Sequence, residues 1–128
     1  MGRILFYKSP YGQGRRNLAM DEWFLDNLGE DDIMLYFYIN ENAVIIGKNQ
    51  NPWRECSLKR MEDDGVELVR RLTGGGAVYH DGGNLNFSFI AGNNVYDEEK
   101  QFTLILEALR KLGIPCEFSG KNDLKVRG

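Results

Sequence analysis

Hydrophobic residues alternate with polar residues, or recur at helical spacing, along most of the chain, and together these patterns predict a mixture of strands and helices. Runs rich in β-branched and aromatic residues predict strands at residues 4–7, 33–39, 43–46 and 66–72. The second and third runs are separated only by Asn-Glu-Asn at residues 40–42. Because such residues favour turns, these two strands are expected to form an antiparallel hairpin.

Three stretches have the spacing and end signals of helices. Residues 15–28 form the first, whose leucines are expected to face a core at Leu18, Leu25 and Leu28. A helix starting near Pro52 is expected to run to Gly65, shortened by the acids in its last turn. Residues 97–112 give the strongest signal, with acids at the start and bases at the end, as the helix dipole favours.

Residues 84–90 alternate strictly between apolar and polar side chains. Leu85, Phe87 and Phe89 are expected to pack in a core, which puts Asn84, Asn86 and Ser88 on the other face of the strand. This polar face suits the floor of a ligand site or, equally simply, a row of side chains in solvent. With a strand at 116–118 and a possible hairpin near 122–123, the chain is predicted to be α/β, in the α+β sense, with a mixed, mostly antiparallel sheet flanked by helices.

Composition narrows the class of protein. The 128 residues suit one domain, and a net charge of −3 with a pI near 5.2 argues against a surface for nucleic acid or an anionic membrane. No apolar run approaches the roughly 18 residues that span a bilayer. Cys56 and Cys116 are expected to be reduced thiols, because with a single histidine they cannot build a zinc or redox motif. A cytoplasmic enzyme or binding domain is therefore expected.

A glycine-rich segment, RRLTGGGAVYHD at residues 70–81, joins two of the predicted strands. Consecutive glycines allow a ligand to approach the backbone closely, and the arginine pair upstream matches phosphate or carboxylate oxygens. Dinucleotide and P-loop motifs do not fit, since the first needs glycine at Tyr79 and the second needs Lys-Ser or Lys-Thr after the last glycine. The residues themselves leave two interpretations open, a site for a phosphate-bearing ligand and a tight hairpin without one.

This segment, continued through residues 83–89, closely resembles the signature of the lipoate-protein ligases. The wider group also holds octanoyltransferases and biotin-protein ligases. Residues 49–56 and 120–124 resemble two further segments of the family, in family order and spacing. The resemblance implies a biotin/lipoate ligase-like fold, which is similar to class II synthetases.

The resemblance also implies an activity. ATP would convert lipoate to lipoyl-AMP, and the lipoyl group would pass to a lysine of carrier domains, which are E2 lipoyl domains of 2-oxoacid dehydrogenases and the glycine cleavage H protein. Asp123 would help to hold Mg²⁺, and His80 is expected to position the ligand in preference to acting as a base. The implied nucleotide and adenylate residues are Arg70, Arg71, Thr73, Gly75, Gly76, Ala77, Val78, Tyr79, His80, Asn84, Asn122 and Asp123.

The C-terminal region departs from the family pattern. The family's catalytic lysine is expected beyond Gly128, since Lys121 and Lys125 do not occupy its position. Residues 1–128 are therefore expected to be the N-terminal part of a catalytic domain, inactive without the remainder of the ligase. The alternatives are an octanoyltransferase, which would need a nucleophilic cysteine, a biotin ligase, and a non-catalytic domain that binds a small molecule.

Overall fold

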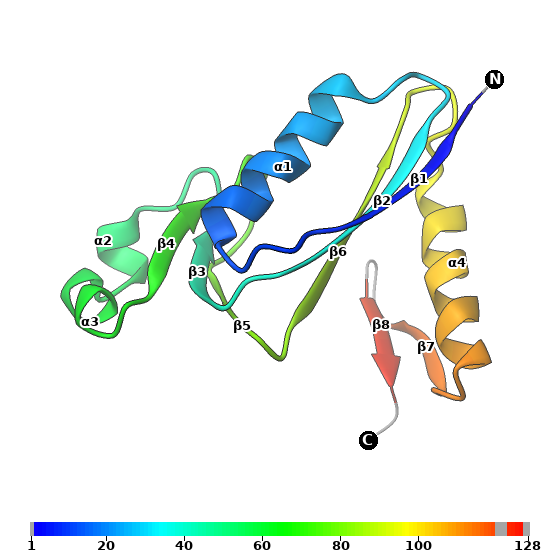
Figure 1. Cartoon of the computed structure of the whole chain (residues 1–128). Helices are drawn as coiled ribbons and strands as arrows, with labels where there is room; N and C mark the ends of the chain where they lie inside the picture. The colour runs from blue at the N-terminus through cyan, green and yellow to red at the C-terminus, as the bar shows by residue number, and fades with distance from the viewer. Residues whose placement is uncertain (1, 120–122, 127–128) are drawn as a thin grey trace. The chain divides into compact units, whose positions relative to one another are not determined.

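The computed structural model describes residues 2–119 and 123–126, with the backbone alone at 118, 119 and 123–126 (Figure 1). The chain divides into two compact units, Met1–Val95 and Tyr96–Gly128. The first unit contains β1 (Ile4–Lys8), α1 (Gly14–Asn27), β2 (Ile33–Ile39), β3 (Asn42–Ile46), α2 (Pro52–Glu55), α3 (Leu58–Asp63), β4 (Glu67–Arg70), β5 (Val78–Asp81) and β6 (Leu85–Ala91). The second contains α4 (Glu98–Lys111), β7 (Cys116–Ser119) and β8 (Asp123–Val126).

The strands of the first unit form two three-stranded sheets. In one, β2 lies between β1, which is parallel to it, and β6, which is antiparallel. In the other, β3 lies between a parallel β4 and an antiparallel β5. With the β7–β8 hairpin, three of the five strand pairs among the described residues are antiparallel. The mixed, mostly antiparallel α/β class predicted from the sequence is confirmed, although the strands make separate sheets.

The predicted hairpin at residues 40–42 is wrong. β2 and β3 belong to different sheets. β2 pairs with β6 and β3 pairs with β5, so the two successive pairs form one interrupted antiparallel ribbon. Ile39 lies opposite Leu85 and Asn42 opposite Asp81, so residues 40 and 41 face the three residues 82–84. One extra residue on one side of a ladder bends the ribbon, as a β-bulge does. The Asn-Glu pair therefore marks the point where the ribbon passes from one sheet to the other.

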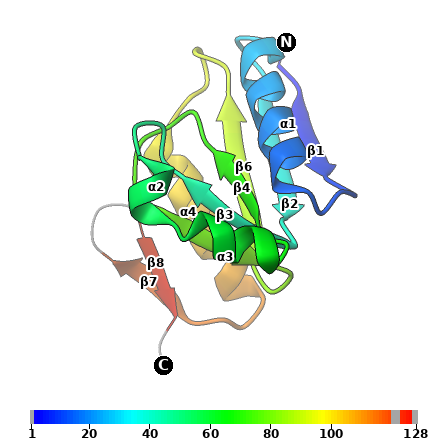
Figure 2. The same cartoon turned by 90° about the vertical axis from the view of Figure 1, so that its left-hand side faces the viewer.

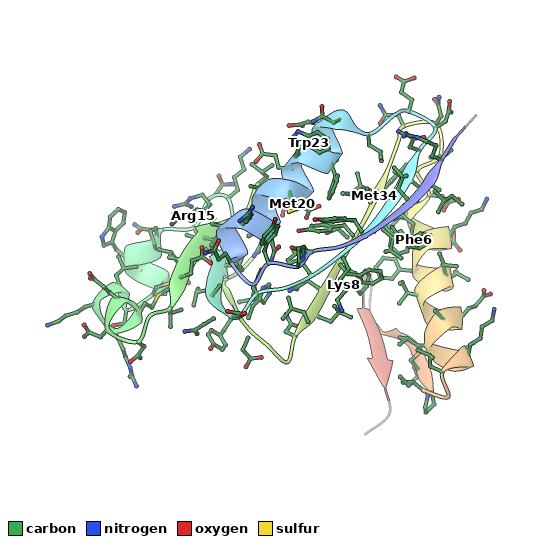
Figure 3. All side chains as sticks on the ribbon, in the orientation of Figure 1. Phe6, Lys8, Arg15, Met20, Trp23 and Met34 are labelled. Atoms are coloured by element: carbon green, nitrogen blue, oxygen red, sulfur yellow. The ribbon has the colours of Figure 1, made fainter. Side chains whose placement is uncertain are left out.

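Helix α1 packs across both sheets, along β2 and β6 of the first and β3 and β4 of the second (Figure 2). Tyr36 is fully buried beneath it and stacks between Tyr7 and Tyr38. Figure 3 shows Met20 on the side of α1 that faces the sheet and Met34 on the strand below, within the same buried cluster. Both tryptophans, in contrast, are exposed, at 61% for Trp23 and 78% for Trp53.

The leucines of α1 only partly follow the prediction. Leu18 packs against the cluster of Ala43, Ile45 and Val69, and Leu28 packs against the cluster around Tyr36. Leu25 is 62% exposed and does not face a core as expected. It borders a cavity between α1 and the strand ends.

The predicted orientation of residues 84–90 is wrong at Leu85 and Phe87, whereas Phe89 is half-buried. Leu85 and Phe87 are exposed, whereas Asn86 and Ser88 are half-buried. The register explains this, because Asn86 and Ser88 pair with Tyr38 and Tyr36, which face α1. Alternation identifies two faces of a strand but not the face that a helix covers. Here α1 covers the polar one, and Ser88 Oγ donates to Asp21 of that helix at 3.0 Å.

The start of α1 is capped from a distant strand. Gln13 precedes the helix without a side-chain cap, and Gly14 and Arg15 donate their backbone N–H groups to the two carboxylate oxygens of Glu67, at 2.7 and 3.2 Å. Free N–H groups at a helix start are normally satisfied by a residue next to them in sequence. Glu67 in β4 therefore joins the helix to the second sheet.

Glu67→Ala is expected to lower the free energy of unfolding by about 1 kcal/mol, the usual cost of losing an N-cap. Urea denaturation followed by circular dichroism measures this. The matched control is Glu62→Ala, which removes an exposed acid from the last turn of α3 and should be neutral or slightly stabilising. Equal midpoints for the two variants would contradict the capping role.

The predicted helix over residues 52–64 is interrupted. It forms two short helices, α2 and α3, that are separated at Cys56 and Ser57, and Pro52 holds the first helical position as expected. Val66 donates its N–H to the Met61 carbonyl after the turn at Gly65. Glu62 and Asp63 still occupy the last turn of α3, so the break divides the predicted helix without changing where it ends.

The second unit follows its predicted elements closely. Asp97 caps α4 by accepting from the N–H of Lys100 at 3.1 Å, and Leu106 and Cys116 are buried between α4 and β7. β7 and β8 form the expected hairpin, with Cys116 opposite Val126. Cys56 and Cys116 are both free thiols, as predicted. In the described part of the chain, no helix has the length and apolar character needed to cross a membrane.

Candidate active site

The glycine loop is not a tight hairpin. β4 and β5 both pair with β3 and not with each other, so residues 71–77 cross from one edge of the second sheet to the other. Arg70 is paired with Ile46 and Val78 with Ile45, which places this crossing over the C-terminal end of β3. Residues 47–51 leave the sheet at the same point, so two loops meet there.

These two loops are interlocked by hydrogen bonds. Arg71 N donates to Ile46 O at 3.0 Å, and Lys48 N donates to Thr73 O at 2.8 Å. The Arg70 guanidinium Nη1 donates to the carbonyls of residues 47, 48 and 50 at 3.3, 3.1 and 2.7 Å. A side chain at Gly47 would overlap the Gly75 carbonyl, so glycine is required where the loops cross. Arg70 was predicted to lie near the nucleotide, and its role seen in this structure is to hold the second loop.

Arg71 organises the glycine loop itself. Its Nε donates to Gly74 O at 3.0 Å and its Nη2 to Gly76 O at 2.7 Å. The C=O and N–H groups of a trans peptide point in opposite directions, so the following N–H groups, of Gly75 and Ala77, point away from the guanidinium. No acceptor in the part of the chain that the structure describes takes either N–H. The loop therefore presents backbone donors that an anion can use.

The special backbone conformation lies at Gly75 and not at Gly76. Gly75 has φ +111°, a value that side chains disfavour, whereas φ at Gly76 is not in the positive region. Of the three glycines in the loop, only Gly75 therefore needs a backbone conformation that favours glycine. A methyl group at Gly76 would meet nothing within 4 Å. Gly76 borders open space, into which a ligand can come.

β5 carries the next predicted residues. Val78 and Tyr79 are exposed, and the Tyr79 hydroxyl donates to Asn42 Oδ1 at 2.7 Å. His80 is half-buried, and its Nδ1 lies 3.0 Å from Asn40 Nδ2. Burial, followed by the positive charge of Arg71, lowers the pKa of His80 below its usual value. His80 is therefore a neutral imidazole at pH 7.

Asn84 lies in the turn between β5 and β6. Its N–H donates to Asp81 O, and its side-chain Nδ2 donates to Asn86 Oδ1 at 3.2 Å. Asn86 Nδ2 is buried, and no group among the described residues accepts from it. A buried amide without a partner is costly, and a bound ligand could supply the missing acceptor. The polar face of residues 84–88 therefore includes a donor beside the predicted site.

The predicted residues 70–80 and 84 all lie in the first unit, with residues 71–77 over the C-terminal end of β3 and Asn84 beyond the opposite end of β5. Asn122 lies outside the described residues, and Asp123 begins β8 in the second unit with its side chain outside the description. The described residues hold no group of three or more histidine, cysteine or acidic side chains that could bind a metal ion.

A cavity of about 540 Å³ lies between α1 and the strand ends and extends to the start of the glycine loop. Its walls are mainly apolar and include Leu18, Ala19, Leu25, Val69, Phe89 and Ile90. Polar side chains also line it, and they come from Arg15, Asp21, Glu22, Tyr38, Arg70, Arg71, Thr73 and Ser88. A concave site with apolar surface and convergent polar groups is typical of small-molecule binding. The alternation of residues 84–90 suggested Ser88, but nothing in the sequence indicated Asp21 or Tyr38.

Burial changes the ionisation of two cavity residues. It raises the pKa of Tyr38 to about 12, so this phenol stays protonated and able to donate. It also raises the pKa of Asp21, an effect that the hydrogen bond from Ser88 partly offsets. Perturbed groups that line a cavity are typical of functional sites.

Outward N–H groups of a glycine loop beside a cavity with apolar walls have the geometry of a site for a small molecule with an anionic end. Comparison with protein-family models identifies the family to which this domain belongs. The model of the lipoyl protein ligase A/B catalytic domain matches residues 13–128, and the chain belongs to that family.

Curated relatives and solved structures agree with this assignment. Lipoate-protein ligase A of Psychrobacter cryohalolentis and that of Bdellovibrio bacteriovorus are each 47% identical over 110 residues, which cover 86% of this chain and 32% of each relative. The chain therefore spans about a third of the length of these relatives.

Three solved structures are also similar. P. falciparum LipL1 in complex with lipoate has a TM-score of 0.84 at 34% identity, over 98% of this chain and 41% of that one. A bi-partite lipoate protein ligase from Thermoplasma acidophilum, described with its E2 lipoyl domain, has a TM-score of 0.81 at 37% identity, over 98% and 51%. A lipoate-protein ligase A bound with ATP has a TM-score of 0.75 at 39% identity, over 95% and 51%.

Proposed function

We propose that residues 1–128 are the N-terminal part of a lipoate-protein ligase catalytic domain. Together with the C-terminal remainder, it uses ATP to convert lipoate to lipoyl-AMP and transfers the lipoyl group to a lysine of a carrier domain. The observation that carries this proposal is the glycine loop, whose N–H groups at Gly75 and Ala77 are directed outward beside an apolar cavity. Family membership and solved relatives with lipoate and with ATP support it.

In this proposal the glycine loop binds the nucleotide. The backbone donors at residues 75–77 and the unused N–H groups of Arg71 face phosphate oxygens, with Thr73, Val78 and Tyr79 close to the nucleotide. Arg70 contributes by fixing the neighbouring loop. His80 and Asn84 complete the adenylate pocket, to which Asn122 and Asp123 are also assigned. Preorganised donors of this kind stabilise charge that develops during a reaction.

The cavity beside α1 is proposed to hold the lipoyl chain. Leu18, Val69 and Phe89 offer apolar surface to an aliphatic tail, while Arg71 places a positive charge at the end nearest the glycine loop. A carboxylate that projects toward Arg71 would lie next to a phosphate on the loop. This orientation suits attack of the carboxylate oxygen on the α-phosphorus, with pyrophosphate as the leaving group.

The second step needs little acid or base assistance from these residues. A carrier lysine attacks the acyl carbon of the mixed anhydride, the C–O bond to phosphate breaks, and AMP leaves. We place no catalytic residue within the chain and assign the family's lysine to the remainder of the ligase. The proposed carriers are E2 lipoyl domains, as in the Thermoplasma acidophilum system, and the glycine cleavage H protein.

Mg²⁺ is proposed to accompany ATP, and the protein is proposed to act in the cytoplasm. Mg²⁺ is usually bound through one or two carboxylates together with nucleotide phosphates. Asp123 would supply the protein ligand. The ion would neutralise phosphate charge when bound.

The test combines the chain with ATP, lipoate and an E2 lipoyl domain, with and without the C-terminal polypeptide. We expect pyrophosphate release and lipoylation only when both parts are present. Transfer from an octanoyl carrier without ATP would instead indicate an octanoyltransferase. Binding of lipoate and ATP without pyrophosphate release, even with both parts, would indicate a non-catalytic binding domain.

The cysteines argue against the octanoyltransferase alternative. Cys116 is buried and directs its thiol to the Leu106 carbonyl, at an S–O distance of 3.8 Å. Cys56 lies between α2 and α3 and makes no hydrogen bond to the single histidine, which bonds to Asn40. Among the described residues, neither thiol is therefore hydrogen-bonded to a histidine that could activate it as a nucleophile.

A further inference from the structure

We propose that Asn17 and Asn40 are positioning residues that hold His80 as a neutral imidazole with its proton on Nε2, so that this N–H donates to an anionic oxygen of the bound ligand. The inference deepens the proposed function and rests on it for the identity of the ligand. The hydrogen-bond chain that carries the inference requires no ligand. Both asparagines are fully buried, although they come from α1 and from the bend between β2 and β3.

The donor-to-acceptor direction of this hydrogen-bond chain is set by backbone carbonyls next to Asn17. Asn17 Nδ2 faces the carbonyl oxygens of Tyr11 and Ile39 at 3.0 and 3.4 Å. Carbonyl oxygens only accept hydrogen bonds, so the atom that faces them must be the amide nitrogen. The Asn17 oxygen correspondingly accepts from the Ser9 hydroxyl. The orientation of the Asn17 amide is therefore fixed by its surroundings.

The orientation of Asn17 determines that of Asn40. Asn17 Nδ2 lies 3.0 Å from Asn40 Oδ1, so the Asn40 oxygen accepts. The Asn40 nitrogen is then the atom directed to His80 Nδ1, also at 3.0 Å. Since an amide nitrogen can only donate, Nδ1 must accept and cannot carry a proton. In a neutral imidazole the proton is then on Nε2.

The surroundings of His80 oppose a second proton. Protonation at Nδ1 would set two donors against each other, the ring N–H and the Asn40 amide. Burial disfavours the charged ring. The positive charge of Arg71 also acts on the ring and would repel a positively charged imidazolium. The other groups in this hydrogen-bond chain are uncharged, and they are Ser9, Asn17 and Tyr36. Nothing in this network stabilises an imidazolium.

A fixed Nε2–H gives His80 a definite role. It is a donor before the ligand arrives, and within the described residues no group accepts from it. Because the positive charge of Arg71 acts on His80, the suitable acceptor is an anionic oxygen of a carboxylate or phosphate. A general base would instead need an unprotonated nitrogen facing the ligand. His80 thus acts as a neutral hydrogen-bond donor.

The first experiment measures the ring by ¹⁵N NMR. His80 is the sole histidine of the chain, so its two ring nitrogens give unambiguous signals. We expect the proton on Nε2 and a pKa below that of an ordinary histidine. Asn40→Asp keeps the shape of the side chain but places a carboxylate against Nδ1. It should move the proton to Nδ1 and raise the pKa above the ordinary value.

Asn93→Asp is the matched control, because it adds the same charge at an exposed position. It should leave tautomer and pKa unchanged. A neutral wild-type ring protonated on Nδ1 would overturn the proposal. So would an Asn40→Asp variant whose pKa rises no further than that of the control. If Asn40→Asp does not fold, the tautomer of the wild-type ring alone tests whether His80 carries its proton on Nε2.

The second experiment measures affinity for ATP and lipoate by calorimetry in the ligase completed with its C-terminal remainder. His80→Phe should weaken binding about tenfold or more, since it removes a hydrogen bond to a charged oxygen. His80→Gln can place an amide N–H near the position of Nε2 and should restore much of the affinity. Equal affinities for the two variants would overturn the donor role. Wild-type ligase that binds neither compound would refute the proposed function, whereas the NMR result would still decide how His80 is held.

Discussion

Replacing Gly76 with alanine is expected to abolish adenylate formation while the chain still folds. A methyl group at this position meets nothing within 4 Å, and φ there is not in the region that favours glycine. The protein itself therefore tolerates the change, and any loss must come from contact with the ligand. Displacing a reacting group by about 1 Å can cost about 100-fold in rate, so pyrophosphate release with ATP and lipoate should fall at least that far.

Two neighbouring glycines provide the controls for this result. Gly74→Ala also introduces a methyl group into open space, but at a residue whose carbonyl is held by Arg71. Gly75→Ala forces a side chain into a positive φ, which costs about 1–2 kcal/mol of folding free energy, and its methyl group would also overlap Arg71 Nη2. Circular dichroism separates loss of folding from loss of activity. Normal turnover by a folded Gly76→Ala ligase would mean that the ligand binds elsewhere.

Arg71→Ala is expected to weaken binding of ATP by about tenfold or more, because a hydrogen bond to a charged oxygen contributes about 1.5–3 kcal/mol. The change also frees the carbonyls of Gly74 and Gly76, so the backbone donors lose their fixed direction. Both of these hydrogen bonds are exposed, and the free energy of unfolding should fall by less than about 1 kcal/mol. Calorimetry and urea denaturation on the completed ligase measure the two effects.

Arg71→Lys and Arg70→Ala extend this comparison. Lysine keeps the charge but cannot make the paired bonds from Nε and Nη2, so we expect it to restore little affinity. Arg70→Ala removes three bonds to the loop at residues 47–50 and should lower stability more than Arg71→Ala does. Unchanged affinity in Arg71→Ala beside a large loss of stability would assign Arg71 a purely structural role.

The strongest periodic patterns predicted their elements well. α1 and α4 lie within one or two residues of the predicted ranges, and β7 and β8 form the hairpin expected after Pro115. These elements are specified locally, by helical spacing with clear ends or by a short loop between strands. The fold class was predicted because hairpin signals outnumbered strand–helix–strand units and because the family resemblance implied it. The class is confirmed, although the hairpin at residues 40–42 is wrong and the parallel pairs β1–β2 and β3–β4 are each joined through helices.

The bend at Asn40 and the orientation of β6 depend on tertiary contacts that local sequence does not encode. Asn-Glu-Asn is a reasonable turn, but Asn40 is buried by α1 and bonds to Asn17, so the chain continues into another sheet. Similarly, Leu85 and Phe87 resemble a core face, although α1 covers the face of Asn86 and Ser88. Each result depends on where a distant helix packs.

The candidate site could be predicted only where it is continuous in sequence. The run from Arg70 to His80 can be identified in the sequence by its glycines and arginines. Asn17 and Asp21 lie on α1 among ordinary helix residues, and Tyr38 resembles any strand aromatic. Their roles depend on the packing of α1, which brings Asn17 against Asn40 and Asp21 against Ser88 of β6, and spacing along the chain does not reveal this.

The placement of the aromatic residues determines which optical signals can be used in these measurements. Tryptophan emission responds to changes in solvent exposure, and both Trp23 and Trp53 already face solvent in the folded chain. Intrinsic fluorescence should therefore change little on unfolding. Tyr36 and Tyr38 are buried and stacked, so near-ultraviolet circular dichroism of tyrosine should report loss of the core. Trp53 follows the loop at residues 47–51 directly, and its emission is better suited to report ligand binding than unfolding.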